Sequence, residues 1–234
     1  MDREESLDRP DPGNAAALSA LLQRPDTWRG SEPAHVAVPS IPTGFAQFDA
    51  LLPGGGWPRG ALTEILVERE GIGELSLLAP ALARLSRQEL WIAFVAPPHL
   101  PYAPALAAAD IDLAKVVMIR PEKSGDTLWA MEQALRSGCC SAVLAWPPFL
   151  TEQAARRLQL AAEAAGCFGV YFSATASTTA LSPAALRLKL SPANGRLKLA
   201  ILKRRGGAVP GALLLDMPRA EEAAVLPVCT LEWE

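Results

Sequence analysis

The chain lacks the residues that several classes of functional site require. It contains two histidines, and its four cysteines form no C-x-x-C pair, so no cluster has the spacing of a metal site. No run of 18 consecutive apolar residues occurs, which argues against a membrane-spanning helix. A G-x-S-x-G motif is also missing, so a hydrolase-type serine nucleophile is not expected. The sequence therefore predicts neither a metal site nor a membrane protein.

The dipeptide Gly-Lys is absent as well, and the first lysine of the chain is Lys115. A Walker-type phosphate loop, G-x-x-x-x-G-K-[ST], needs that lysine between a strand and a helix. The turn after the strand-like run 61–67 has the right position, but it places Glu74 after Gly71 and Gly73. A carboxylate about 4 Å from a triphosphate costs about 4 kcal/mol at an effective dielectric constant of about 20.

We therefore interpret Gly71, Gly73 and Glu74 as a degenerate phosphate-loop position. The local alternative is an ordinary turn with a capping acid at the start of a helix. The acid that would position magnesium is missing too, since the run 141–146 ends in Trp146 and continues with proline. We expect no enzymatic activity and no cofactor, with an active ATPase of unusual site as a minor alternative.

Negative charge is absent between Glu163 and Asp216, although the whole chain carries −3. The seven basic residues of this window predict contacts with phosphate or with an acidic partner surface. Whether DNA itself is contacted stays open, and the alternative is a solvated strand end. The candidate contact residues are Lys203, Arg204, Arg205, Arg187, Lys189, Arg196 and Lys198.

Strand-like and helix-like patterns alternate from residue 61 onward, which predicts an α/β fold with a mostly parallel central sheet flanked by helices. Two further strands joined at Asn194-Gly195 predict a C-terminal antiparallel edge hairpin. The predicted strands are 61–67, 89–95, 115–120, 141–146, 168–173, 186–190, 196–202 and 212–216.

Four helices are expected between these strands. Pro80 should bend or interrupt the first helix, and Ser124 or Asp126 should cap the third. Thr151 and Gly166 should begin and end the fourth. The predicted ranges are 74–87, 102–109, 124–136 and 151–165.

The chain divides by composition into a tail with a short helix (1–40), a core domain (41–217) and a second tail (218–234). The charged start of the chain has no apolar segment of the signal-peptide type, so a cytoplasmic location is expected. Trp57 is a candidate partner anchor, with packing on its own core as the alternative. Trp233 is a candidate anchor in a docking tail.

The run IPTGFAQFDALLPGGGWPRGALTEIL (41–66) resembles the entry to the core of RecA-like recombinases. That family carries an I-P-T-G…D-x-L-L-G-G-G-x-P-x-G segment beside its first strand. The phrases GIGELSLLAPALARL (71–85), WIAFVAPPHLPYAPAL (91–106) and LAILKRRGG (199–207) are similar to the ImuA family of translesion-synthesis-associated proteins. The cell-division inhibitor SulA shares the G-I-G-E-L type of loop and is a relative.

The ImuA resemblance implies a RecA-like core and a non-catalytic role in damage-inducible mutagenic translesion synthesis. The implied partners are a Y-family polymerase-like protein of the ImuB type, an error-prone C-family DNA polymerase and RecA. The alternative is a SulA-type division inhibitor that acts on the tubulin-like ring protein, in which case overexpression should give filamentous cells.

Overall fold

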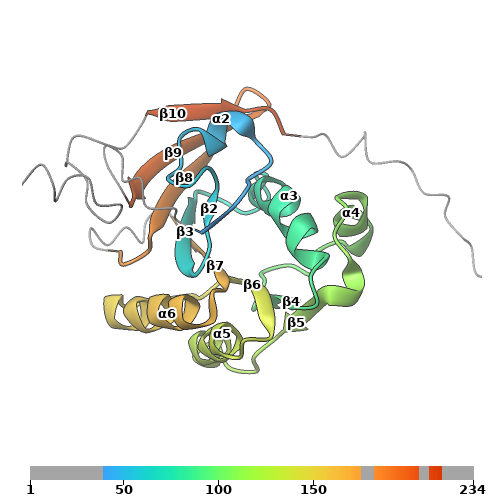
Figure 1. The fold of residues 1–234 in the computed structure, drawn as a ribbon, viewed down its shortest axis with the longest axis vertical. Helices are drawn as coiled ribbons and strands as arrows, with labels where there is room; N and C mark the ends of the chain where they lie inside the picture. Colours follow the sequence, from blue (N-terminus) through green and yellow to red (C-terminus); the bar gives the residue numbers. More distant parts are fainter. Residues whose placement is uncertain (1–38, 175–181, 206–210, 218–234) are drawn as a thin grey trace, which may run out of the picture.

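The protein is built around one eight-stranded sheet (Figure 1). The computed structural model describes residues 39–174, 182–205 and 211–217. The strand order is β10-β9-β8-β3-β7-β6-β4-β5, in which the strands from β8 to β5 are parallel and β9 and β10 are antiparallel to their neighbours. The strands are β3 (Ala61–Val67), β4 (Trp91–Val95), β5 (Val116–Ile119), β6 (Cys140–Ala145), β7 (Phe168–Ala174), β8 (Leu186–Ala193), β9 (Arg196–Arg204) and β10 (Ala212–Leu215).

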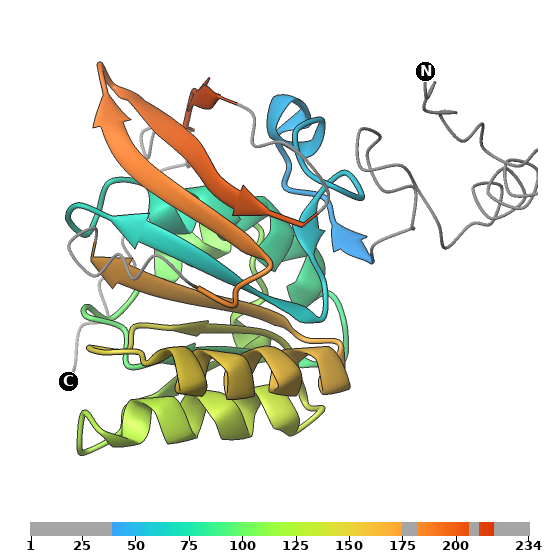
Figure 2. The same ribbon diagram turned by 90° about the vertical axis from the view of Figure 1, so that its left-hand side faces the viewer.

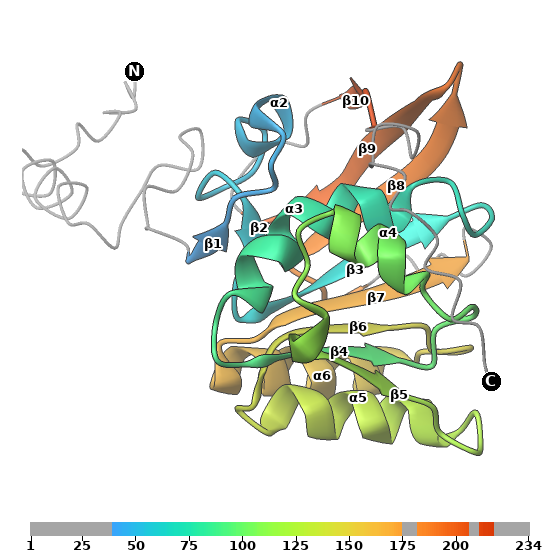
Figure 3. The ribbon, with the colours of Figure 1, turned by 90° about the vertical axis from the view of Figure 1, so that its right-hand side faces the viewer.

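Helices cover both faces of the parallel part of the sheet (Figures 2 and 3). One cluster of buried residues joins the sheet to α3 and α4, and a second joins its other face to α5 and α6. The mostly parallel sheet and its flanking helices are therefore confirmed. The helices are α2 (Ala46–Asp49), α3 (Glu74–Ser86), α4 (Ala103–Ala108), α5 (Asp126–Arg136) and α6 (Glu152–Ala165), with a 3₁₀ turn η1 (Leu113–Lys115) before β5.

Strand β3 lies between β7 and β8, and all seven of its residues are buried. A strand covered on both faces needs a nearly continuous apolar run, and ALTEILV supplies one apart from Thr63 and Glu64. The predicted bounds, 61–67, match the observed ones. The turn after β3 thus begins at the carboxyl edge of the sheet, where ligand sites of such folds usually form.

The predicted hairpin is also confirmed. Strands β8 and β9 pair antiparallel across Asn194 and Gly195, whose φ angles are +50° and +77°. Positive φ at both positions is what a tight hairpin turn requires. Strand β10 then pairs with β9, so the hairpin extends the sheet at this end.

The predicted helix ends are only partly correct. Thr151 Oγ1 accepts a 3.2 Å hydrogen bond from the Ala154 N–H, and Gly166 ends α6 at φ +63°, as expected. Neither Ser124 nor Asp126 caps α5, because Gly125 occupies the cap position without a side-chain bond. Helix α3 runs through Pro80 instead of being interrupted there.

A small ribbon of β1 (Ser40–Ile41) and β2 (Trp57–Pro58) closes one end of the core together with α2. Phe48 and Trp57 are fully buried, and the Trp57 ring lies 5.2 Å from Phe48 and 5.8 Å from Phe168. The segment before β3 is therefore part of the folded core. No helix among the described residues is long and apolar enough to cross a bilayer.

Candidate functional site

The turn between β3 and α3 is held by the side chain of Glu74. Its Oε1 accepts a 2.8 Å hydrogen bond from the Gly71 N–H, and its Oε2 accepts bonds of 2.9 Å from Ile72 and 3.1 Å from Gly73. Gly71 and Gly73 have φ angles of +76° and +108°, a region that favours glycine. Three successive backbone donors thus converge on one carboxylate.

This arrangement determines whether the turn can bind a phosphate. In a working phosphate loop such backbone N–H groups face an external anion. Here the chain's own carboxylate fills that position, and the Glu74 side chain is buried while it does so. The geometry is that of the capping-acid alternative, at the positive end of the α3 dipole.

The neighbouring strand ends supply no carboxylate. Strand β4 is followed by Ala96 and two prolines, and β6 by Trp146 and two prolines. The Trp146 ring stacks on Phe172 at 4.4 Å and lies 6.2 Å from Phe94. Within the described ranges no group of three histidine, cysteine or acidic residues is arranged to hold a metal ion. Where β6 ends, the sheet edge is therefore lined by stacked aromatic rings.

Two of the basic candidates, Arg187 and Lys189, pair with carboxylates of β3 and of the turn after it. Arg187 is almost fully buried, and its Nε lies 2.7 Å from Glu64 Oε2, although the two groups are not aligned as a hydrogen bond. Ser173 Oγ donates to the other Glu64 oxygen at 3.0 Å. Lys189 Nζ pairs with Glu68 at 3.2 Å. These two cations therefore join β8 to β3 and to the turn that follows it.

The remaining basic candidates also have contacts within the chain, with one exception. Arg196 makes two 2.6 Å bonds to Asp216, which lower the pKa of that carboxyl, and Arg205 bonds Glu163 at 2.8 Å. Lys198 is exposed and has no hydrogen bond or ion pair within the described part of the chain.

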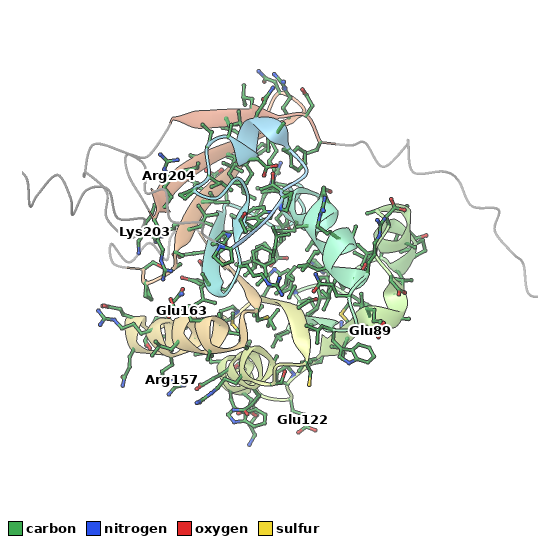
Figure 4. All side chains as sticks on the ribbon, in the orientation of Figure 1. Glu89, Glu122, Arg157, Glu163, Lys203 and Arg204 are labelled. Atoms are coloured by element: carbon green, nitrogen blue, oxygen red, sulfur yellow. The ribbon has the colours of Figure 1, made fainter. Side chains whose placement is uncertain are left out.

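The end of β9 packs against two other segments (Figure 4). Lys203 Nζ donates to the Ser182 carbonyl at 2.5 Å, and burial together with Arg187 and Arg205 lowers the Lys203 pKa. Arg204 donates to the Leu51 carbonyl. Glu163, which accepts the hydrogen bond from Arg205, lies on the same side of the molecule as Lys203 and Arg204.

The stretch between Glu163 and Asp216 contains no acidic residue, but the surface that it forms does include acidic side chains. Four carboxylates from elsewhere in the chain or from its border meet it, so seven positive charges are balanced to a local excess of three. The structure brings these cations to one end of the sheet, but it directs most of them inward or onto partners. The predicted contact with DNA or a partner stays a prediction for these residues.

A crevice lies beside this basic end, between the β2 segment and the start of β8. It is small, about 30 Å³, which suits ordered water better than an organic ligand. Its lining includes Pro58, Arg59, Leu186, Arg204 and Arg205. We therefore do not assign a ligand to it.

The two tryptophan candidates differ in what the structure says of them. Trp57 has no exposed surface and lies in the core, as the alternative interpretation expected. Its role as a partner anchor stays a prediction. Trp233 lies outside the described residues.

The sequence analysis did not single out three large apolar residues that are exposed in the structure. Leu100, Tyr102 and Phe149 are 65%, 72% and 72% exposed, and they lie in the loops that follow β4 and β6. Their signal in the sequence is a Pro-Pro pair that follows each strand and is itself followed by large apolar residues. Taken alone, the Pro-Pro pair predicts only the end of a strand.

Comparison with known proteins points to one family. A family model described as cell division inhibitor SulA matches residues 60–169. This range runs from just before β3 to the start of β7, so it contains the Glu74 turn and both apolar loops. The ribbon of β1 and β2, and strands β8 to β10, lie outside it.

Individual relatives carry the same name. A cell division inhibitor SulA of Edwardsiella piscicida is 41% identical over 97 residues, which cover 41% of this chain and 58% of that protein. One from Serratia proteamaculans (strain 568) is 32% identical over 114 residues, covering 49% and 68%. One from Yersinia pestis (strain Pestoides F) is 34% identical over 110 residues, covering 47% and 66%. The chain therefore spans about 58–68% of the length of these relatives.

A solved structure of SulA from Pseudomonas aeruginosa is also similar. It has a TM-score of 0.41 and 24% sequence identity, and the match covers 48% of this chain and 97% of that one.

These findings overturn the ImuA identification and the role in translesion synthesis that depended on it. The predicted partners, a Y-family polymerase-like protein, a C-family polymerase and RecA, are wrong for the same reason. The phrase GIGELSLLAPALARL lies within the matched range, whereas most of the RecA-like run and the phrase LAILKRRGG lie outside it. The family's description names an inhibitor of cell division. This chain belongs to the family of the cell division inhibitor SulA.

Proposed function

We propose that the protein inhibits cell division in the manner of a SulA-type regulator, by binding the tubulin-like ring protein in the cytoplasm. The observation that carries this proposal is the family match over residues 60–169, which is supported by a relative covered over 68% of its own length. The matched part includes strands β3 to β6 and helices α3 to α6. Binding, and not catalysis, is the activity that an inhibitor of this kind requires.

The proposal includes a response to DNA damage, which the SulA resemblance suggests. It also treats the Glu74 turn as a degenerate phosphate site on a RecA-like core. Three backbone donors already bound to Glu74 support that interpretation, because a phosphate would have to displace a carboxylate of the same sign. The division into a core of 41–217 and two tails stays part of the proposal.

Overexpression in a rod-shaped bacterium tests the main proposal. Cells that make the full chain should grow as filaments, because division stops while growth continues. The matched control is the same chain with Leu78→Asp, which places a charge at a fully buried position of α3 and should unfold it. Normal cell length at an expression level equal to that of a filament-forming SulA relative would contradict the proposal.

Calorimetry tests the nucleotide part separately. Titration of the purified chain with ATP and magnesium should show no saturable heat at micromolar concentrations. Clear binding in that range would refute the degenerate-site interpretation without affecting the division assay.

A further inference from the structure

Strands β9 and β10 have an outer face that no helix among the described residues covers. Their register sets Leu214 beside Lys198 and Ala212 beside Ala200, so these four side chains lie on one side of the two strands. Figure 2 shows that side, with α5 and α6 beneath the hairpin and no helix in front of it. The buried cluster that α5 and α6 form with the sheet contains no residue of β9 or β10.

This outer face is more apolar than a sheet surface in water needs to be. Strand β10 reads ALLL, an unbroken apolar run, and β9 contains the run LAIL. An antiparallel strand with one face in water usually alternates apolar and polar residues, whereas an unbroken apolar run is typical of a strand covered on both faces. Leu202 and Leu214 are nevertheless 42% and 43% exposed. The two strands therefore have the composition of a covered surface, and the described residues do not supply the cover.

Lysines border the exposed leucines. Lys198 lies opposite Leu214, and it has no hydrogen bond or ion pair within the described ranges. Lys189 of β8 lies opposite Ala200 and pairs with Glu68, with both of these charged side chains about half exposed. A segment that covers this face must offer large apolar side chains to the leucines and carboxylates to the lysines.

The segment that follows β10 in the sequence has that composition. Residues 218–234 read PRAEEAAVLPVCTLEWE and contain one basic and four acidic residues. Trp233 stands between Glu232 and Glu234, so one large aromatic side chain has a carboxylate on either side. Tryptophan offers a large apolar contact area, and the flanking carboxylates match the charge of the bordering lysines.

This segment also begins close to the outer face. It follows Met217, whose side chain packs against the core beside Gly73. Trp233 is 16 residues further along the chain, a stretch that spans at most about 55 Å when extended. The nine residues of β9 extend about 30 Å, so Trp233 can reach any part of the face. A tether of this kind raises the effective concentration of the segment, so even weak contacts favour docking.

We propose that the outer face of β9 and β10 docks the chain's own 218–234 segment. Trp233 packs on Leu202 and Leu214, and the glutamates beside it face the bordering lysines. This inference is independent of the proposed function, because β9 and β10 lie outside the family-matched range. Added salt should weaken the docking without abolishing it, since salt screens the charges and leaves the apolar contacts in place.

Crosslinking in the full chain tests the docking directly. An aromatic photo-crosslinking amino acid in place of Trp233 should react with residues of β9 or β10 in the same chain, and mass spectrometry of the digested protein identifies the site. Crosslinks that join two chains would assign the face to a second copy. Crosslinks within one chain that avoid β9 and β10 would place the segment elsewhere. Either result, or the absence of any crosslink, would overturn the proposal.

Two matched variants of the crosslinking protein show whether the exposed leucines hold the segment. The face variant carries Leu202→Glu and Leu214→Glu. The control variant carries Trp129→Glu and Leu160→Glu on α5 and α6, where the two side chains are each 64% exposed. The face variant should lower the yield of the crosslink about tenfold, because two carboxylates there repel the acidic segment and replace its apolar contacts. The control variant should leave the yield unchanged, and equal yields in the two variants would overturn the proposal.

A change confined to the segment leaves the sheet itself intact. Glu232→Lys with Glu234→Lys should lower the crosslink yield in the otherwise unchanged chain, because lysines then face lysines. The same two changes added to the face variant should recover most of its lost yield, since the charges are again opposite. An unchanged yield when the segment alone is altered would overturn the proposal, whether or not the face variant keeps the circular dichroism spectrum of the parent.

Discussion

The family-matched part of the chain and the part outside it are built on different plans. In the matched range the sheet is covered by helices on both faces, and β4 and β6 are almost wholly buried. Strand β9 is covered on one face only, so alternate residues differ sharply: Ile201 is 4% exposed and Leu202 is 42% exposed. The outer strands therefore depend on the matched part for their stability.

Ion pairs join the two parts. Arg187 and Lys189 of β8 reach Glu64 and Glu68, which belong to β3 and to the turn after it. A stretch of sequence without acids has thus been placed against acids from another stretch. The difference teaches that the charge of a segment and the charge of the surface it forms are separate quantities.

The largest effect should come from removing the tryptophan that fixes the N-terminal ribbon to the core. We expect Trp57→Ala to lower the free energy of unfolding by about 3–5 kcal/mol, because the cavity left beside Phe48 and Phe168 cannot collapse fully. Urea unfolding followed by circular dichroism measures this. The matched control is Trp91→Ala, since that ring is 44% exposed and its loss should cost far less. Equal losses in the two variants would show that the ribbon is not part of the cooperative core.

The second prediction concerns the ion pair between Glu64 and Arg187, which connects the two parts. Glu64→Ala should cost about 3 kcal/mol, because it leaves the Arg187 guanidinium buried without its counter-charge. The double change Glu64→Leu with Arg187→Met should restore most of that loss, since it removes both charges and keeps the volume. Urea midpoints of the three proteins test this. A double variant as unstable as the single one would mean that the ion pair is not what couples β3 to β8.

The sequence predicted the central elements well because each carries a strong local pattern. The bounds of β3 were predicted correctly, and Thr151 and Gly166 begin and end α6 as expected. Such features depend on residues within a few positions of one another. The cap of α5 was missed because two acceptable capping residues flank Gly125, and their side chains alone do not indicate that Gly125 takes the cap position.

The candidate site was only partly predictable. The turn at Glu74 was located from its neighbours, but its three backbone bonds could not be foreseen, because they depend on two glycines with positive φ. The partners of the basic residues were missed altogether. Arg187 and Glu64 are far apart in sequence, and only the pairing of β8 with β3 brings them together.

The third prediction concerns the Glu74 turn. Glu74→Ala should lower stability by about 1–2 kcal/mol, because three backbone N–H groups lose a charged acceptor and water replaces it only in part. Glu74→Gln should lose less, since its amide oxygen still accepts. Thermal unfolding and hydrogen exchange at Gly71, Ile72 and Gly73 measure both. Unchanged exchange at these three amides in Glu74→Ala would show that the carboxylate does not order the turn.

The smallest effect should come from the exposed pair between Glu163 of α6 and Arg205 after β9. The hydrogen bond from Arg205 lowers the Glu163 pKa, so the pair contributes stability above the unfolded-state pKa of about 4.3 and loses it as pH falls through the lower folded-state pKa. Solvent screening limits the contribution to below about 1 kcal/mol, because both side chains are about half exposed. Glu163→Gln should therefore be slightly less stable than the parent at pH 7, and the difference should vanish once the pH falls below the lowered folded-state pKa. It should also shrink in 1 M salt, where exposed charges are screened within about 3 Å. Urea unfolding across this pH range at both salt concentrations tests the pair, and a difference independent of pH would assign its effect to packing instead of charge.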